Sequence, residues 1–475
     1  MAPWLVVVAL LLGCGGAATE TDAPELRLVS PSPDGVANAA QPRLTWEGSE
    51  RAASYRVTLF ADTQHTRSIE AQTVDTPSAT ARTAFALGDL VYARVEALDG
   101  AGLAFRAADS RFRVVPVPSD FPPIAISIRD ARRMQPGYTL LNVQDPLPPH
   151  QEDRVAALLV VNDHGEVVWW LRFEPGFVTD ARLLPNGHLL YVYSPNGGPS
   201  QAFESTWDGA VTWRSRDGVE AHHEVTPGPD GHYLYITAIV RDVLGVPFEG
   251  DGLELVDPLT NRVLWSWDIF DHVAVTDVSA ADLLLPGTTL QGQDWTHSNG
   301  VVWDQARGVL WLSVRNLDRM LAIDYPSGAV RAVIGKNGLG GDGLMDHQHA
   351  PELESDGSIL YYDNGNQRGW SRVAGFQWNE AAGTATSTFE WRGEEPFLDP
   401  ALGDVDRLPN GNLMVVSGVG GEALGKPARV LELGPSGDTV WELDLGNGVR
   451  LLGYWIYRAE RLAPDQLPAF ARPFG

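Results

Sequence analysis

The stretch Gly165-Glu-Val-Val-Trp169 sets the pattern from which the fold is interpreted. It is a turn residue followed by a short apolar run that carries an aromatic side chain, as expected of a strand leaving a tight turn. The pattern returns at intervals of roughly 44 to 67 residues. The five further copies are Gly209–Trp213, Asn261–Trp265, Gly328–Arg331, Thr386–Trp391 and Gly437–Trp441.

A second motif places a tight turn before a strand. Its copies are Pro185–His188, Pro229–His232, Ser355–Ser358 and Pro409–Asn412. Each copy contains Asn-Gly or Asp-Gly, which favour hairpin turns with positive φ. Units of about 50 residues with four strands are typical of β-propeller blades. The repeats therefore predict an all-β fold with a six-bladed β-propeller over residues 124–475. The absence of a long amphipathic helix pattern disfavours a parallel α/β sheet.

A separate small β-domain is predicted over residues 26–118. Tyr55, Val57 and Leu59 alternate with polar residues, so they are expected on one buried face. Together with Trp46 in an early strand, they give a segment that resembles a fibronectin-III or immunoglobulin-like β-sandwich. The prolines of residues 116–123 do not suit a central strand and mark the predicted boundary.

Composition narrows the functional classes. The 475 residues include 35 basic and 61 acidic ones, a formal net charge of −26. This acidity argues against a nucleic-acid partner, which requires a basic face. The length predicts two or three domains. Cys14 is the one cysteine, which excludes an internal disulfide and a cysteine-based zinc site.

The first residues look like an export signal. Residues 5–12 form an apolar run too short to span a bilayer. Leu11-Leu-Gly-Cys14 resembles the bacterial lipobox, which predicts lipidation of Cys14, a signal peptide over 1–14 and a tether over 15–25. The protein is then expected to be an exported lipoprotein of the cell envelope, held by its lipid anchor on the periplasmic or surface side of the outer membrane. An incidental cysteine in an ordinary signal peptide is the alternative.

Histidines are grouped in the repeat region. Five of the 11 fall in three segments of different predicted blades: His222-His223, His297 and His347-Gln-His349. In an extended strand, His297 shares a face with Asn299 and His347 shares a face with His349, whereas only one of His222 and His223 can face the channel. Arg315 follows in the next predicted strand and could approach His297 across a ladder.

Imidazoles beside a guanidinium indicate an anion site with a possible nucleophile. Arginine presents a planar fork to sulfate or phosphate oxygens, and a neutral imidazole can attack or carry protons. A lone histidine in a β-protein is more often structural, but three segments in different blades favour function. Residues 363–369, Asp-Asn-Gly-Asn-Gln-Arg-Gly, are a second anion-site candidate, for which a rigid loop is the preferred interpretation.

Over about residues 129–458 the chain resembles the bacterial arylsulfate sulfotransferases that work without a nucleotide sulfate donor. Four stretches carry the resemblance: His222-His-Glu-Val, Asp294-Trp-Thr-His-Ser-Asn299, Gln348-His-Ala350 with Tyr362-Asp-Asn-Gly-Asn-Gln-Arg-Gly369, and Gly403–Asn412. The resemblance implies a six-bladed propeller with an N-terminal β-sandwich. It also implies transfer of a sulfuryl group from a phenolic sulfate ester to an acceptor phenol, without a cofactor or metal.

The resemblance also implies residue roles. His349 matches the nucleophile that becomes a sulfohistidine in a ping-pong reaction, and His297 and Asn299 match a pair near the sulfuryl oxygens. Arg315 matches the sulfate-binding arginine, and His223, or less favourably His222, matches a further channel histidine.

Two departures and two rival hypotheses accompany this prediction. Ala350 stands where relatives often have Asp, and Ser417-Gly418 stands near the position of an expected Lys-Thr pair, with Lys426 only later. One rival is a non-catalytic, surface-anchored propeller that binds a small anion or a protein. The other is a metalloenzyme in which three histidines ligate zinc or copper.

Overall fold

The computed structural model describes residues 26–145, 155–275, 292–393, 396–420, 425–446, 453–468 and 471. The chain divides into two compact units between Val114 and Val115, just before the proline-rich segment. Within the described residues, regular structure consists of β-strands and short 3-10 helices, so the predicted all-β class is confirmed. The 3-10 helices are η1 (Pro229–Gly231), η2 (Ile269–Asp271) and η5 (Arg315–Leu317). None of the described helices is both long and apolar enough to span a membrane.

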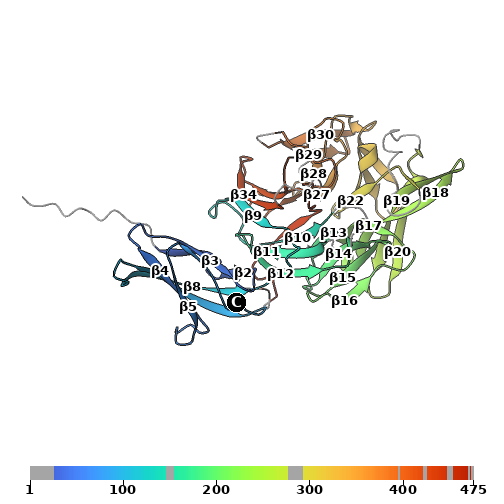
Figure 1. Cartoon of the computed structure of the whole chain (residues 1–475). Coiled ribbons are helices and arrows are strands. Elements are labelled where there is room, and N and C mark those ends of the chain that lie inside the picture. The colour runs from blue at the N-terminus through green and yellow to red at the C-terminus, as the bar shows by residue number, and fades with distance from the viewer. Residues whose placement is uncertain are drawn as a thin grey trace, which may run out of the picture. The chain divides into compact units, whose positions relative to one another are not determined.

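The smaller unit has two sheets (Figure 1). One has the order β1-β3-β6: β1 (Arg27–Ser30), β3 (Arg43–Glu47) and β6 (Ser78–Thr80). The other has the order β2-β8-β7-β4-β5: β2 (Gly35–Ala37), β8 (Ala104–Val114), β7 (Leu90–Leu98), β4 (Ser54–Phe60) and β5 (Ser68–Val74). Their apolar faces form one core in which the predicted Trp46 meets Tyr55 edge to face, with ring centroids 5.4 Å apart. We interpret this unit as the predicted sandwich.

In its described residues, the larger unit has six sheets of four or five strands, which follow one another in chain order. The strands pair antiparallel except in two short parallel pairs. The first sheet contains β10 (Tyr138–Gln144), β11 (Ala156–Val161), β12 (Val167–Arg172) and β35 (Ala459–Leu462). The second contains β13 (Gly176–Leu183), β14 (Leu189–Pro195), β15 (Gln201–Ser205) and β16 (Val211–Arg214). The third contains β17 (Ala221–Pro227), β18 (Tyr233–Val243), β19 (Val246–Asp257), β20 (Arg262–Asp268) and β21 (Gln293–Asp294), which pairs with β19 in parallel.

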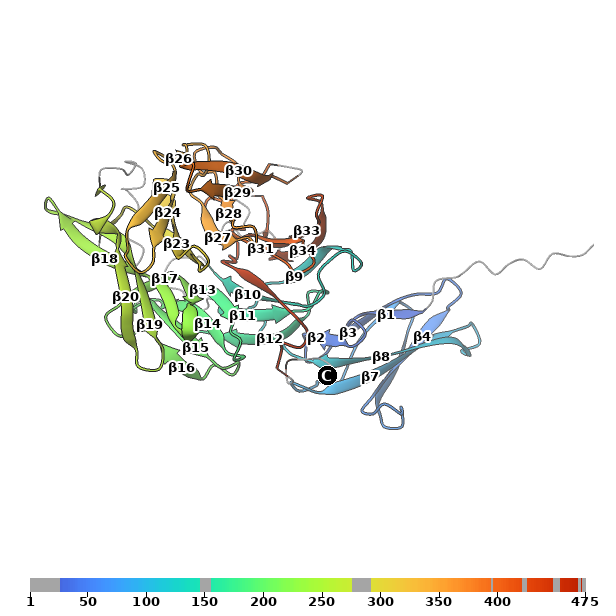
Figure 2. The ribbon, with the colours of Figure 1, turned by 180° about the vertical axis from the view of Figure 1, so that it is seen from behind.

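The remaining sheets continue this order. The fourth contains β22 (Ser298–Asp304), β23 (Val309–Val314), β24 (Arg319–Asp324), β25 (Val330–Gly335) and β26 (Leu339–Gly340). The fifth contains β27 (His349–Leu353), β28 (Ile359–Asp363), β29 (Arg372–Asn379) and β30 (Thr384–Trp391). The sixth contains β31 (Asp404–Arg407), β32 (Leu413–Ser417), β33 (Ala428–Leu433), β34 (Thr439–Leu445) and β9 (Ile124–Arg129). Figure 2 shows β9 beside β34, so the start of this unit joins its last sheet.

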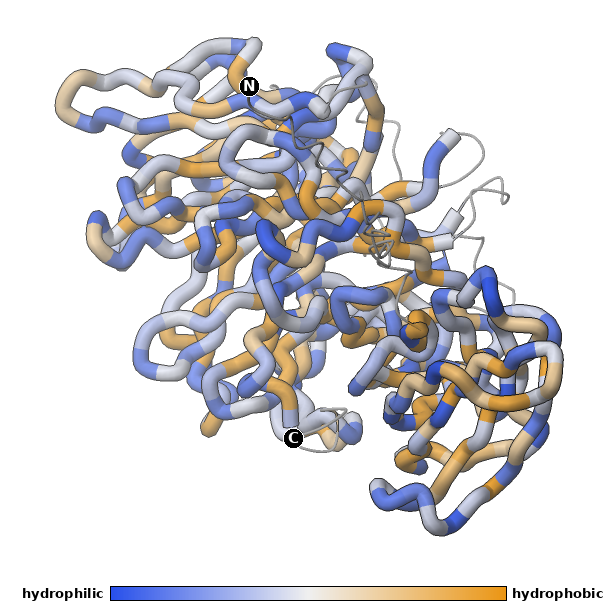
Figure 3. Tube along the Cα trace, turned by 90° about the vertical axis from the view of Figure 1, so that its left-hand side faces the viewer, coloured by the Kyte–Doolittle hydropathy of each residue, from blue (hydrophilic) through white to orange (hydrophobic). Residues whose placement is uncertain are grey.

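The two sequence motifs occupy equivalent places in these sheets. The six copies of the first motif provide the turn and the fourth antiparallel strand, namely β12, β16, β20, β25, β30 and β34. The copies of the second motif form the turns before β14, β18, β28 and β32. Apolar segments alternate with polar turns along the chain (Figure 3), and the apolar clusters lie between neighbouring sheets.

Contacts between motif copies link each sheet to the next. The indole nitrogens of six tryptophans donate across sheets: Trp169 to Trp207 O, Trp213 to Asn261 Oδ1, Trp265 to Pro326 O, Trp267 to Gly328 O, Trp391 to Gly437 O and Trp441 to Asp163 O. Arg331 joins the fourth sheet to Glu380 in the fifth. Trp441 belongs to the sixth sheet and Asp163 to the first, so the series of contacts closes on itself. We interpret the six sheets as six propeller blades.

Candidate active site

The first strands of the sheets contact one another, and four of them contain a bulge. The register shifts between Thr179 and Arg182, His222 and Val225, Ser298 and Gly300, and His349 and Glu352. Within or beside these shifts the backbone is left-handed at Asp180, His223, His297 and Ala350. A bulge inserts a residue and redirects the side chains around it. The simple alternation of faces therefore does not apply where the predicted site residues lie.

His349 is held in one tautomer by Asn364. The imidazole is 2% exposed, and its Nδ1 lies 2.6 Å from Asn364 Oδ1. The amide nitrogen of Asn364 donates to the carbonyl oxygens of Asp399 at 2.8 Å and Leu402 at 2.7 Å, so the amide oxygen is the atom that faces the imidazole. An amide oxygen only accepts hydrogen bonds. The proton is therefore on Nδ1, and Nε2 carries the lone pair.

The surroundings of His349 keep its imidazole neutral. Burial lowers its pKa well below the usual value, and the positive charge of Arg315 and the nearby His297 lower it further, against the opposing hydrogen bond to Asn364. A neutral imidazole with an available lone pair on Nε2 is the nucleophilic form.

The positive charge of Arg315 acts on His349, and the strand order places Arg315 beside the His297 segment. It follows β23 directly, and Val314 at the end of that strand pairs with Ser298. The guanidinium is largely buried, with Nη1 donating to Asn316 Oδ1 at 2.8 Å and Nη2 donating to Pro400 O at 3.1 Å. These bonds fix the plane of the fork that is predicted to hold sulfuryl oxygens.

His223 and His297 face each other. Their ring centroids are 4.8 Å apart, and the ring of His223 also lies 6.0 Å from that of Tyr457. Burial lowers the pKa of His223 well below its usual value, as do the charges of His297 and other neighbours. Nδ1 of His297 bonds the carboxylate of Asp294. The structure thus brings together His223, His297, His349 and Arg315 from four different segments.

His222 has a different environment. Its Nδ1 lies 2.7 Å from Nδ1 of His223, and its Nε2 lies 3.2 Å from Asp251 Oδ1. Burial alone would lower its pKa, but the hydrogen bond and negative charge of Asp251, with Glu249 and Asp294, raise it overall. The imidazole is therefore a buried partner of a carboxylate, and it positions the ring of His223.

Asn299 supports the backbone of the nucleophile segment. Its amide nitrogen donates to Gln348 O at 2.9 Å, and its Oδ1 accepts from Ser313 Oγ at 2.8 Å. The side chain is 1% exposed. The interactions seen here hold the peptide before His349 in place.

The segment Asp399–Leu402 was not anticipated from the sequence. The carbonyl oxygens of Asp399 and Leu402 orient Asn364, and that of Pro400 orients Arg315. One four-residue segment thus positions both the imidazole and the guanidinium. The nearest sequence signal was the neighbouring segment 363–369, which contains Asn364.

This segment is anchored by the Asp399 carboxylate. It accepts from Lys426 Nζ at 2.5 Å and from Ser417 Oγ at 2.6 Å, and the hydroxyl of Tyr362 bonds the same group. Lys426 also lies 2.6 Å from Ser417 Oγ. A lysine and a hydroxyl therefore meet in the last sheet, although Ser417 ends β32 and Lys426 precedes β33.

An aromatic cavity of about 420 Å³ adjoins the histidines. Phe177, Trp455 and Tyr457 line it together with His223 and Leu402. Ring centroids of Phe177 and Trp455 are 6.5 Å apart. Such a cavity suits a planar aromatic group whose reacting oxygen points toward the imidazoles.

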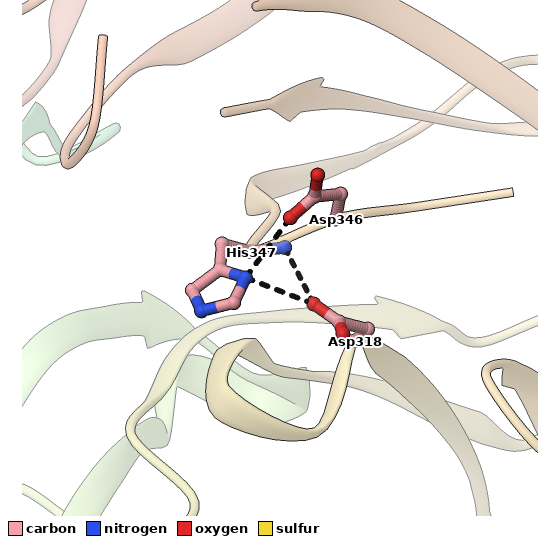
Figure 4. Close-up of side chains that lie close together, drawn as sticks. All are labelled: Asp318, Asp346 and His347. Carbon is pink, nitrogen blue, oxygen red and sulfur yellow. Dashed lines mark hydrogen bonds and ion pairs between the residues drawn. The ribbon is translucent and has the colours of Figure 1, made fainter. Parts of the chain in front are cut away.

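The residues that could ligate a metal differ from the three histidines predicted to do so. Among the described residues, the one group of three potential ligands is Asp318, Asp346 and His347, drawn in Figure 4. Nδ1 of His347 lies 3.0 Å from a carboxylate oxygen of each aspartate. Both carboxylates also accept other hydrogen bonds, from the backbone of residues 347, 367 and 368 and from the side chains of Gln367 and Lys336. This network fits an anchored turn before His349.

Comparison with known proteins identifies the family of the chain. The family model described as Arylsulfotransferase (ASST) matches residues 126–445. The chain therefore belongs to the arylsulfotransferase family. No curated protein matches it.

Similarity to solved structures is more distant. The periplasmic gluconolactonase of Pseudomonas aeruginosa is 14% identical, covering 85% of this chain and 99% of its own, with a TM-score of 0.39. An auxiliary nutrient binding protein from Bacteroides ovatus is 9% identical, covering 90% of this chain and 91% of its own, with a TM-score of 0.37.

Proposed function

We propose that the protein moves a sulfuryl group from a phenolic sulfate ester to an acceptor phenol, with His349 as the nucleophile. Membership of the arylsulfotransferase family supports this class of activity. The observation that carries the proposal is the hydrogen bond from His349 Nδ1 to Asn364, which leaves the Nε2 lone pair close to the charge of Arg315.

In the first half-reaction, Nε2 of His349 attacks sulfur. An N–S bond forms, the ester S–O bond breaks, and the phenolic oxygen leaves with the bonding electrons. Charge spreads over the peripheral sulfuryl oxygens, as in phosphoryl transfer, and Arg315 stabilises it there.

The leaving oxygen needs a proton, which we assign to His297. Asp294 bonds Nδ1 of this imidazole, so Nε2 is the nitrogen that exchanges a proton. His223, whose lowered pKa keeps it neutral, is then a hydrogen-bonding partner between His297 and the aromatic cavity. In the second half-reaction a phenol attacks the sulfohistidine sulfur, the N–S bond breaks, and the phenolic proton passes to His297.

Intact-protein mass spectrometry after exposure to p-nitrophenyl sulfate, without acceptor, tests the proposal. We expect a gain of one sulfuryl group that maps to His349 and disappears when phenol is added. His349→Ala should lose the label and reduce p-nitrophenol release by roughly 10³-fold or more. His164→Ala, in a hairpin turn of the first sheet, is the control and should be labelled normally.

Labelling at another residue would remove His349 from the role of nucleophile. Failure of a series of aryl sulfates to label any residue would favour the ligand-binding alternative.

We also propose that the protein is an exported lipoprotein. Cys14 and the predicted signal segment lie outside the described residues, so the proposal rests on their sequence. Metabolic labelling with a radioactive fatty acid should mark the wild type but not Cys14→Ala. Equal labelling of both would overturn the proposed anchor.

A further inference from the structure

The aromatic cavity beside His223 contains polar groups that the transfer reaction does not use. Its wall includes Gln144, Thr179 and Glu220 in addition to the aromatic rings. These residues belong to the first strands of the first two sheets and to the segment before β17. The cavity therefore has features that could distinguish one substituted phenol from another.

Buried polar atoms at this wall lack partners within the described part of the chain. They are Gln144 Oε1, Thr179 Oγ1 and Trp455 Nε1. Gln144 is only 1% exposed, so its side-chain carbonyl is removed from bulk water. A buried carbonyl without a hydrogen bond costs free energy, and a bound donor would satisfy it.

A carboxylate supplies negative charge at this wall. Glu220 is the acidic residue among the lining residues, and none of them is lysine or arginine. Its Oε2 accepts from Ser200 N at 2.9 Å, which holds the carboxylate in place. The buried imidazole of His222 at the same wall faces the carboxylate of Asp251.

We propose that this cavity selects phenols that carry an ammonium group, with Glu220 as the charge partner and Gln144 Oε1 as a hydrogen-bond acceptor. The inference rests on the proposed function and names the substrate class of the same site. Aromatic faces at Phe177 and Trp455 add to the attraction, because a cation is stabilised over an aromatic ring. A carboxylate on the phenol would instead be repelled by Glu220.

Three acceptors test the selection, with p-nitrophenyl sulfate as the donor. They are 4-(2-aminoethyl)phenol, 4-ethylphenol and 3-(4-hydroxyphenyl)propanoate, which are cationic, neutral and anionic at pH 7. We expect kcat/KM to be roughly tenfold or more higher for the cationic acceptor than for the neutral one, as for a hydrogen-bonded charge. The anionic acceptor should be the poorest.

Glu220→Gln should reduce kcat/KM for the aminoethyl phenol by roughly tenfold and bring the cationic and anionic acceptors close together. Glu174→Gln removes the same charge from an exposed position on the β12–β13 connection and should leave the ranking unchanged. Gln144→Leu is the second variant, and it should lower the preference for the ammonium group in the same direction.

The outcomes separate the two proposals. The inference about the cavity is overturned if sulfated wild-type protein transfers the sulfuryl group equally well to all three acceptors. It is also overturned if Glu220→Gln keeps the full preference for the cationic acceptor. In both cases the transferase proposal stands. If p-nitrophenol is released with no acceptor and no sulfated protein forms, the transferase proposal itself fails.

Discussion

The first strands of the sheets carry, or lie beside, two different sets of buried ionisable groups along their length. Near one end lie the imidazoles of His223 and His349 with the guanidinium of Arg315. One to three residues further along the same strands, β17 has Glu224 and β27 has Glu352, in a cavity of about 400 Å³. We call these the histidine end and the acidic end.

The acidic end holds more carboxylates than cations. Its acidic side chains are Glu224, Glu352, Asp404, Asp406 and Glu460, and the arginines in its lining are Arg182, Arg407, Arg458 and Arg461. Burial raises the pKa of Glu352 and Glu460 to about 7 each, and Asp404 adds to the shift at Glu352. Arg458 lies 3.3 Å from Glu224 and 3.5 Å from Asp404, which offsets part of the repulsion.

Carboxylates at or near this end also accept hydrogen bonds from backbone amides of the first strands, close to the bulges. Asp180 Oδ2 accepts from Val225 N at 2.7 Å, Glu224 Oε2 from Val301 N at 2.9 Å, and Glu460 Oε2 from Leu183 N at 2.7 Å. Each of these first strands is the edge strand of its sheet, so the amides on its open side need such partners. The comparison indicates that carboxylates at the acidic end hold the edge strands close to the bulges, and that the bulges redirect the side chains of the histidine end.

Removing the amide that orients the nucleophile should have the largest effect. Asn364→Ala deletes the acceptor for His349 Nδ1 and both donors to the 399–402 segment, so the ring loses its fixed tautomer. We expect kcat to fall by roughly 10²-fold, because a displaced reacting group costs about this much. We expect Tm to change little. Stopped assays of p-nitrophenol release and thermal melts measure both quantities.

Asn366→Ala, whose Nδ2 donates only to Pro400 O, is the matched control and should retain most activity. A similar loss in both variants would assign the effect to the loop.

Loss of the anchor beneath this segment should have a smaller effect. Lys426→Met removes the cation from Asp399 but leaves Ser417 and the hydroxyl of Tyr362 in contact with that carboxylate. We expect kcat to fall roughly tenfold and KM to change less, as for a group that acts through its neighbours. Arg429→Met removes a nearby cation that contacts Glu442 and should leave kcat near the wild-type value. A rise in KM alone would place Lys426 at the substrate instead.

The donor half-reaction should tolerate mild acid. The lowered pKa of His349, caused by burial, Arg315 and His297, means that its imidazole stays unprotonated below pH 6.5. Protonation of the His349 imidazole inactivates this nucleophile only at pH values below its lowered pKa. We therefore expect kcat/KM for p-nitrophenyl sulfate to fall less than twofold from pH 7.5 to 6.5. Quenched assays across this range measure it. A tenfold fall would contradict the neutral environment inferred for the histidine end.

The sequence predicted the repeats and the histidine segments because both depend on local patterns. A hairpin turn and a strand with one tryptophan are visible in a few residues, as Gly437–Trp441 shows. The role of Asn364 was not predictable, since it depends on carbonyl oxygens 35 and 38 residues away. Gly365 beside it gave a partial signal: its φ is +72°, and a Cβ there would lie 1.8 Å from Trp370 O. That strain requires glycine and marks a fixed turn.

Alternation of faces failed where backbone conformation departs from a strand. The spacing of His297 and Asn299 predicted one shared face, but His297 has a φ of +50° and bonds Asp294, whereas Asn299 turns to Gln348 and Ser313. Positive φ at a histidine is rare enough that periodicity alone does not predict it. The acidic end was missed for a related reason, because its carboxylates meet only after six sheets close around them.

The smallest expected effect concerns stability and tests the acidic end alone. Glu352 has a pKa raised to about 7 by burial and by Asp404, whereas an unfolded glutamate titrates near 4.3. Between these values the folded protein binds more protons, so the contribution of Glu352 to stability falls as pH rises and is least favourable above pH 7. Glu352→Gln removes the ionising group. It should raise Tm by roughly 2 °C at pH 8, with a smaller rise at pH 5.

Calorimetry at both pH values, with the exposed Glu174→Gln as a control, measures this difference. Because Glu352 lies three residues beyond His349 on the same strand, the variant also tests whether the two ends are separable. Preserved sulfation of His349 in Glu352→Gln would show that the histidine end does not need this particular charge. A lower Tm of the variant at pH 8 would contradict this prediction. It would mean that the ionised Glu352 stabilises the folded protein through Arg182 and Arg458.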